Sequence, residues 1–270
     1  MAHFTDLIKG KFFCVMLNFY YIFIGGNDVS IPTGNINEIK FNSLSLMEEI
    51  TLLVYIPANY SPLLKYTICI VNDGKDYFQM GRLGRIADQF HHEGIIENTI
   101  FVGIPYNNVQ DRRSKYHPDG EKQSRYIKFL AHELVPFLDQ EFPTYGVGRG
   151  RALMGDSLAA TVSLMTALQY PHTFGRVIMH SPYVDEKVLN AVQQVEEPDL
   201  VQLYHVIGKE EDEVPTTDGK RSNFILPNRA LHKVLTEKQF PQFYDEFDGN
   251  HTWKHWQKDL PRAIEHMFND

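Results

Sequence analysis

Runs of β-forming apolar residues alternate along the chain with segments whose apolar positions have helical spacing. The runs predict strands at residues 36–42, 50–56, 66–71, 99–104, 151–154, 176–180, 200–207 and 242–247. The spacing predicts helices at residues 82–93, 124–140, 158–169, 228–238 and 259–268. Continuous apolar runs such as residues 66–71 are typical of strands buried in a parallel sheet. This alternation predicts an α/β fold with a mostly parallel central sheet and helices on both faces.

One long polar segment interrupts the alternation. Residues 107–122 are rich in Asn, Arg and Lys, which predicts an exposed loop. The helix expected over residues 124–140 follows this segment, and Pro136 within it is predicted to cause a kink. No internal repeat or linker-like stretch divides the rest of the chain, so one domain over residues 34–270 is the simplest interpretation.

The amino-terminal part has a different pattern. Residues 12–24 are almost all apolar and follow Lys9 and Lys11, as in a signal peptide, but no A-x-A-like cleavage site follows. The run is also too short to span a bilayer. We therefore expect an extension of unassigned role over residues 1–33, no stable membrane insertion and a cytoplasmic protein, with export as the alternative.

The overall charge and the cysteine content exclude several classes of function. The 270 residues include 26 basic and 34 acidic side chains, a net charge of −8. A protein that binds the phosphate backbone generally needs the opposite sign, so nucleic acid is not an expected partner. Cys14 and Cys69 are too few for a disulfide framework or a cysteine metal site, and both lie in apolar runs that favour buried thiols. No metal and no organic cofactor is expected.

The sharpest chemical motif is Gly155-Asp156-Ser157-Leu158-Ala159, which lies between a short strand and a helix of small residues. A nucleophile elbow requires this setting, because its serine stands on a tight turn where strand and helix nearly touch. The helix that follows directs backbone N–H groups toward the serine. The alternative interpretation is that Ser157 merely caps this helix.

A serine nucleophile needs a base, and a histidine base needs an acid to orient it. His251 follows the predicted strand at 242–247 and a turn, so it can fold back over the strand ends. Four consecutive acids, residues 210–213, follow the strand that ends at Gly208. Such a run is usually a solvated loop, but one of these acids could orient His251. The order serine, acid, histidine is that of α/β-hydrolases.

Several segments together carry a family resemblance: residues 70–78 (IVNDGKDYF), 111–118 (DRRSKYHP), 129–138 (FLAHELVPFL), 154–159, 170–182 and 248–253 (DGNHTW). In this order they resemble the "putative esterase" family of α/β-hydrolases, which includes ferric-enterochelin, feruloyl and esterase D-like enzymes. The likeness covers about residues 34–268. It implies an α/β-hydrolase fold and a serine esterase.

The resemblance also implies roles for individual residues. Ser157 would be the nucleophile and His251 the base, and counting from Gly208 gives Glu211 as the acid, with Glu210 and Asp212 still open. The oxyanion hole would use the backbone N–H groups of Lys75 and Leu158. The resemblance implies that Arg112 and Tyr116 line the substrate site, for which a structural role of their loop is the alternative.

Two departures from the family pattern bear on activity. Ala159 and Ala160 stand where relatives usually have glycine, so the turn must tolerate a methyl group. Lys115 stands where siderophore-cleaving relatives often have Glu, which argues against a siderophore substrate. We expect hydrolysis of a small-molecule carboxylic ester through an acyl-enzyme. An acyltransferase, or a non-catalytic ligand-binding protein on the same fold, is the alternative, and a homodimer is compatible with either.

Overall fold

The computed structural model describes residues 30–216 and 219–269. The residues from Ile31 onward form one compact unit. The apolar segment at 12–24 lies outside the described residues, as does nearly all of the predicted extension over 1–33. The predicted boundary between extension and domain stays a prediction.

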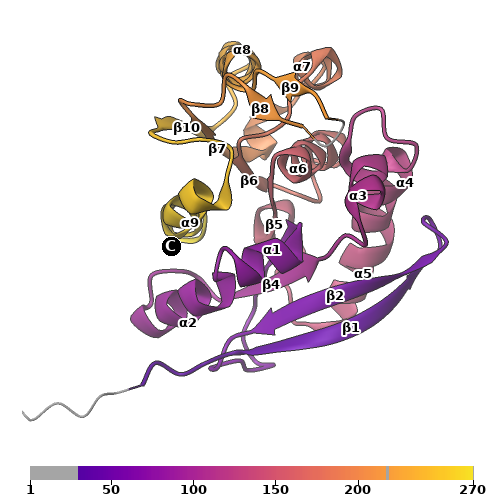
Figure 1. The fold of residues 1–270 in the computed structure, drawn as a ribbon. Helices are drawn as coiled ribbons and strands as arrows, with labels where there is room; N and C mark the ends of the chain where they lie inside the picture. Colours follow the sequence, from indigo (N-terminus) through magenta and orange to yellow (C-terminus); the bar gives the residue numbers. More distant parts are fainter. Residues whose placement is uncertain (1–29, 217–218, 270) are drawn as a thin grey trace, which may run out of the picture. The chain divides into compact units, whose positions relative to one another are not determined.

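An eight-stranded sheet forms the centre of this unit, in the order β1-β2-β4-β3-β5-β6-β7-β10 (Figure 1). The strands are β1 (Asn35–Ser43), β2 (Glu48–Ile56), β3 (Thr67–Asn72), β4 (Thr99–Ile104), β5 (Arg151–Asp156), β6 (Arg176–His180), β7 (Gln202–Gly208) and β10 (Gln242–Phe247). Strand β2 pairs antiparallel with β1 and β4, whereas the other neighbours pair in parallel. The mostly parallel sheet predicted from the sequence is confirmed.

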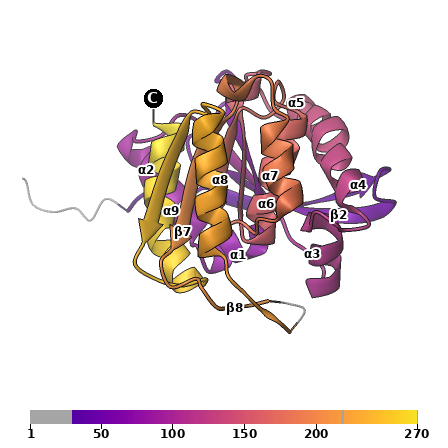
Figure 2. The same ribbon diagram turned by 90° about the horizontal axis from the view of Figure 1, so that it is seen from above.

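Helices cover both faces of the sheet. Side chains of α1 (Gly74–Gln79), α2 (Leu83–Glu93) and α9 (Trp253–Phe268) pack in the hydrophobic cluster on one face. The other face carries α4 (Gln123–Lys128), a π-helix (Phe129–Leu134), α5 (Val135–Glu141), α6 (Leu158–Gln169), α7 (Glu186–Gln193) and α8 (Ile225–Glu237). Short 3-10 turns lie at Gly148–Gly150 and Pro198–Leu200. Helix α3 (Val109–Tyr116) follows β4, and the small hairpin of β8 (Val214–Pro215) and β9 (Arg221–Ser222) follows β7 and projects from the sheet (Figure 2).

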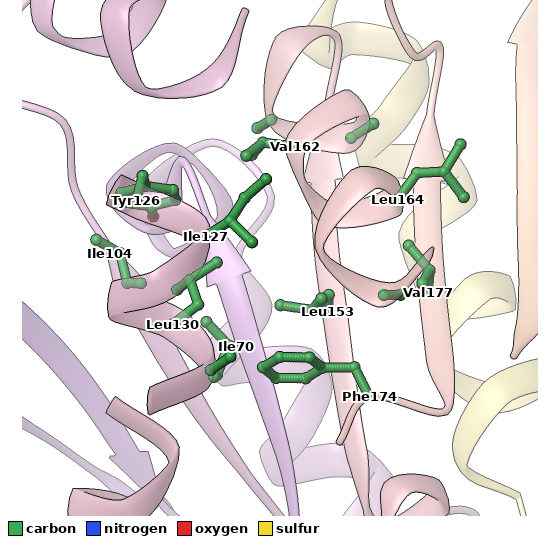
Figure 3. Packing of buried hydrophobic residues seen from close by; sticks show 14 of the residues in the cluster. Ile70, Ile104, Tyr126, Ile127, Leu130, Leu153, Val162, Leu164, Phe174 and Val177 are labelled. Atoms are coloured by element: carbon green, nitrogen blue, oxygen red, sulfur yellow. The ribbon is translucent and has the colours of Figure 1, made fainter. Parts of the chain in front are cut away.

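Strand β3 shows how the sheet separates the two hydrophobic clusters. Successive side chains of a strand point to opposite faces. Ile68 and Ile70 therefore enter one cluster, together with Leu153 of β5 (Figure 3), whereas Cys69 and Val71 enter the other. Cys69 is fully buried, as predicted, and burial raises the pKa of its thiol. Cys14 lies outside the described residues.

The prediction of an exposed loop over residues 107–122 is wrong, because α3 occupies its centre. The Asn108 side chain caps this helix by accepting a hydrogen bond of 2.9 Å from the Asp111 N–H. Lys115 is only 4% exposed and forms ion pairs with Glu48 at 2.7 Å and Asp111 at 2.9 Å. Some charges of this segment are thus paired inside the protein, which local composition does not reveal.

Two predicted helices differ in detail. The helix expected over 124–140 is interrupted by the π-helix Phe129–Leu134, and Pro136 stands in the first turn of α5 beyond it, where a missing N–H costs little. The last helix begins at Trp253 and not near residue 259. It continues through Pro261, since a proline removes only one hydrogen bond from the helix and the apolar face beyond it is buried.

Candidate active site

The candidate site lies where the parallel strands end. The carboxyl ends of parallel strands meet at one edge of the sheet, which is where α/β proteins bind ligands. A pocket of about 340 Å³ opens there, and both Ser157, after β5, and His251, after β10, line it. The structure therefore brings together the predicted nucleophile and the predicted base.

Ser157 occupies a strained turn between β5 and α6. Its φ of 53° and ψ of −123° are rare for a residue with a side chain. The Ser157 N–H donates a hydrogen bond of 2.9 Å to the His180 carbonyl, which holds the turn in place. A Cβ atom at Gly155 would lie 2.4 Å from the Ala159 carbonyl carbon, so glycine is required at Gly155, whereas Ala159 and Ala160 fit, fully buried. This is the geometry of a nucleophile elbow.

Glu211 is the acid that contacts His251. Its Oε2 lies 2.6 Å from Nδ1 of His251. Its Oε1 accepts hydrogen bonds from the Gly208 N–H at 2.9 Å and from the Ser181 hydroxyl at 2.6 Å. Glu211 is 0% exposed, whereas Glu210 and Asp212 are exposed. These three contacts fix the position of the buried carboxylate beside His251.

Aromatic rings hold the His251 imidazole on two sides. Its centroid lies 4.5 Å from the Phe224 ring and 4.9 Å from the Trp256 ring. The Trp256 indole N–H also donates to the Ser181 hydroxyl at 3.0 Å, so one residue contacts the imidazole and steadies its acid. Sequence reasoning missed Ser181 and Trp256 in this role, because nothing in the local pattern places either beside Glu211.

The residues predicted for the oxyanion hole lie at the starts of two helices. Leu158 is the first residue of α6 and lines the pocket. Lys75 is the second residue of α1, after Gly74 and the left-handed Asp73, and its side chain is exposed. The N–H groups of a first helical turn have no partner within the helix, so these two amides are available as donors.

The two residues predicted to line the substrate site have different settings. Arg112 lines the pocket, but its guanidinium is bound to the Asp73 carboxylate through hydrogen bonds of 2.8 and 2.5 Å. Tyr116 is 1% exposed and packs against the Tyr126 ring at 5.2 Å, outside the pocket lining. The buried ion pair of Asp73 and Arg112 was missed, although Asp73 stands in the Asp-Gly turn singled out from the sequence.

Within the described residues, no cluster of three or more His, Cys, Asp or Glu side chains is arranged to hold a metal ion. Nor does the described part of the chain contain a helix with the length and hydrophobicity needed to cross a membrane.

Comparisons with known proteins agree with this geometry. Residues 43–267 match the protein family described as "Putative esterase". The chain is 50% identical over 87% of its length to the uncharacterized protein YjcH of Bacillus subtilis, of which it covers 98%. Two solved structures share the fold: enterobactin esterase of Shigella flexneri (TM-score 0.74, 16% identity, covering 86% of this chain and 58% of that one) and a ferulic acid esterase of Anaeromyces mucronatus (TM-score 0.70, 16% identity, covering 89% and 93%). The predicted α/β-hydrolase fold is confirmed.

Proposed function

The chain belongs to the "Putative esterase" family of carboxylic ester hydrolases, and from this premise we propose that it cleaves esters through a covalent acyl-enzyme on Ser157. The observation that carries the proposal is the 2.6 Å contact between buried Glu211 and His251 Nδ1, at the pocket that also holds the strained Ser157 turn. A nucleophile, a base and an orienting acid in these roles are the parts of a serine hydrolase.

In this mechanism Glu211 keeps the proton of His251 on Nδ1, so that Nε2 is free to accept the Ser157 hydroxyl proton. The serine oxygen attacks the ester carbonyl, and the N–H groups of Leu158 and Lys75 stabilise the tetrahedral oxyanion. His251 then protonates the departing alcohol, which leaves the acyl group on Ser157. Water, deprotonated by the same imidazole, attacks the acyl-enzyme and releases the carboxylic acid.

A panel of p-nitrophenyl esters of increasing acyl length tests the proposal. The wild type should hydrolyse at least one of them, and Ser157→Ala should lower kcat by several orders of magnitude while the protein stays folded. Ser124, exposed and outside the pocket lining, gives the matched control Ser124→Ala, which should keep full activity. Unchanged turnover in Ser157→Ala would refute the proposal, and transfer of the acyl group to an added alcohol in preference to water would indicate an acyltransferase.

A further inference from the structure

One wall of the pocket holds more carboxyl groups than the cations beside it can pair with. Three carboxylates line it: Asp73 at the end of β3, Asp76 in the first turn of α1, and Asp156, which directly precedes Ser157. We call these three residues the acidic wall. The family mechanism described above uses none of them.

Among the residues that the structure describes, a single cation, Arg112, faces the acidic wall, and it is already engaged. Both Nε and Nη2 of Arg112 bind the Asp73 carboxylate, and Nη2 also donates to the main-chain oxygen of Asp156 at 3.2 Å. The Asp156 carboxylate itself lies 3.9 Å from Nη2, beyond hydrogen-bond distance. Arg113 also lines the pocket, but its charge acts on His117. Burial and the charge of Arg113 lower the pKa of His117. The acidic wall therefore has three acids for one guanidinium.

Asp156 shows that a partner is missing. Asp156 is 5% exposed, and its Oδ1 has no hydrogen-bond partner among the described residues. Burial, and next the charge of Asp73, raise the pKa of Asp156 well above its usual range. A buried carboxyl oxygen without a partner is costly, and a positive charge brought into the pocket would favour the ionised form of Asp156 and offset the repulsion from Asp73.

Aromatic side chains complete a setting suited to a cation. The Tyr106 hydroxyl donates to Asp76 at 3.2 Å, and Trp253 packs edge-on against Tyr77 of α1 with ring centroids 4.7 Å apart. Tyr106 and Trp253 both line the pocket. The faces of aromatic rings attract cations, and quaternary ammonium groups in particular are recognised by aromatic and acidic side chains together.

We infer that the pocket binds a positively charged alkylammonium group of its substrate, held between the acidic wall and the rings of Tyr106 and Trp253. The inference rests on the proposed function, since it makes the protein an esterase selective for cationic esters. A neutral ester of the same shape brings no positive charge to Asp76 or Asp156, so it binds less well.

Binding can be tested without catalysis. Choline and 3,3-dimethylbutan-1-ol have nearly the same shape and differ in charge, and their binding to the Ser157→Ala protein can be compared by ligand-observed NMR titration. Choline should bind at least about tenfold more tightly, and Asp76→Asn and Asp156→Asn should each remove most of the difference. Asp119→Asn is the matched control, because exposed Asp119 lies outside this pocket and should leave the ratio unchanged. Equal binding of the two alcohols, or a preference unaffected by Asp76→Asn and Asp156→Asn, would overturn the inference.

Turnover separates this inference from the proposed function. Two pairs of esters differ only in charge. Acetylcholine carries the charge on its alcohol part, and 3,3-dimethylbutyl acetate is its neutral counterpart. p-Nitrophenyl 4-trimethylammoniobutanoate carries the charge on its acyl part, and p-nitrophenyl 5,5-dimethylhexanoate is its neutral counterpart. The cationic member of at least one pair should have a kcat/KM about tenfold higher, and added salt should reduce this ratio. Equal hydrolysis within both pairs would overturn the inference and leave the esterase intact. Preferred binding of choline, with no ester of either pair cleaved by the wild type, would keep the cation site and count against the proposed function.

Discussion

Replacing Glu211 by glutamine tests whether this residue, and neither of its acidic neighbours, orients His251. Two of the three hydrogen bonds to this side chain, from the Gly208 N–H and the Ser181 hydroxyl, end on Oε1. A glutamine carbonyl oxygen in that place keeps both, which leaves the amide NH₂ to face Nδ1 of His251. Nδ1 must then accept a hydrogen bond, so the imidazole proton moves to Nε2. A protonated Nε2 can no longer receive the Ser157 proton.

The wrong tautomer should lower kcat by about 10⁴-fold, the scale of the equivalent change in a serine protease. KM should change little, because Glu211 is fully buried and absent from the pocket lining. The free energy of unfolding should fall by about 1–2 kcal/mol, since all three hydrogen bonds can still form but none of them has a charged acceptor any longer. Steady-state hydrolysis of the best ester of the p-nitrophenyl panel gives the kinetic constants, and urea unfolding gives the stability.

Glu210→Gln and Asp212→Asn make the same chemical change at exposed positions on either side of Glu211. Both should keep kcat within about twofold of wild type, because changes to exposed side chains rarely matter. A loss in either control as large as in Glu211→Gln, or a Glu211→Gln enzyme that keeps more than a tenth of its turnover, would refute the reasoning.

Three further changes test the surroundings of the site. Ser181→Ala removes a 2.6 Å hydrogen bond to the Glu211 carboxylate and should lower kcat about tenfold at constant KM; a change confined to KM would contradict this positioning role. Arg112→Met leaves Asp73, which is 1% exposed, without its ion partner, and should lower the free energy of unfolding by about 3–5 kcal/mol in urea titrations; an unchanged midpoint would show that the pair contributes nothing. Burial lowers the pKa of His205 to about 4, whereas a histidine in the unfolded chain binds its proton below about pH 6.5, so the unfolded state gains the proton first. His205 should therefore contribute a fall of about 2 kcal/mol in the free energy of unfolding between pH 7 and pH 5. His205→Gln should lose that part of the slope, and equal slopes in the two proteins would rule it out.

The central strands could be predicted because a strand that is buried on both faces has an almost entirely apolar composition. β3 and β4 are buried on both faces, so nearly every residue is apolar or β-branched. Helix α3 could not be predicted in the same way, since its buried charges pair with residues far away in the chain, Arg112 with Asp73 and Lys115 with Glu48. A polar composition indicates a loop only when its charges face water.

The candidate site also contains residues that local sequence reveals and residues that only the folded chain reveals. Ser157 and His251 stand out locally, because an elbow needs small residues at fixed positions and a catalytic histidine follows a strand. Composition alone does not single out the acid, since residues 210–213 are all acidic. The family resemblance indicated Glu211 but left Glu210 and Asp212 open, and the fold distinguishes Glu211 through its contacts with Ser181 and Gly208. The unpartnered Oδ1 of Asp156 is likewise a property of the folded chain alone.

The central claim, that Ser157 is the nucleophile, is tested most directly by covalent labelling. A serine-reactive phosphonate should add one label to the wild type, and peptide mass spectrometry should place it on Ser157, in parallel with the loss of ester hydrolysis. Ser157→Ala should take up no label, and His251→Ala should take it up far more slowly, because its serine lacks a base, whereas His255→Ala, outside the pocket lining, should react like the wild type. A label on another residue, or full inhibition with Ser157 unmodified, would contradict the account.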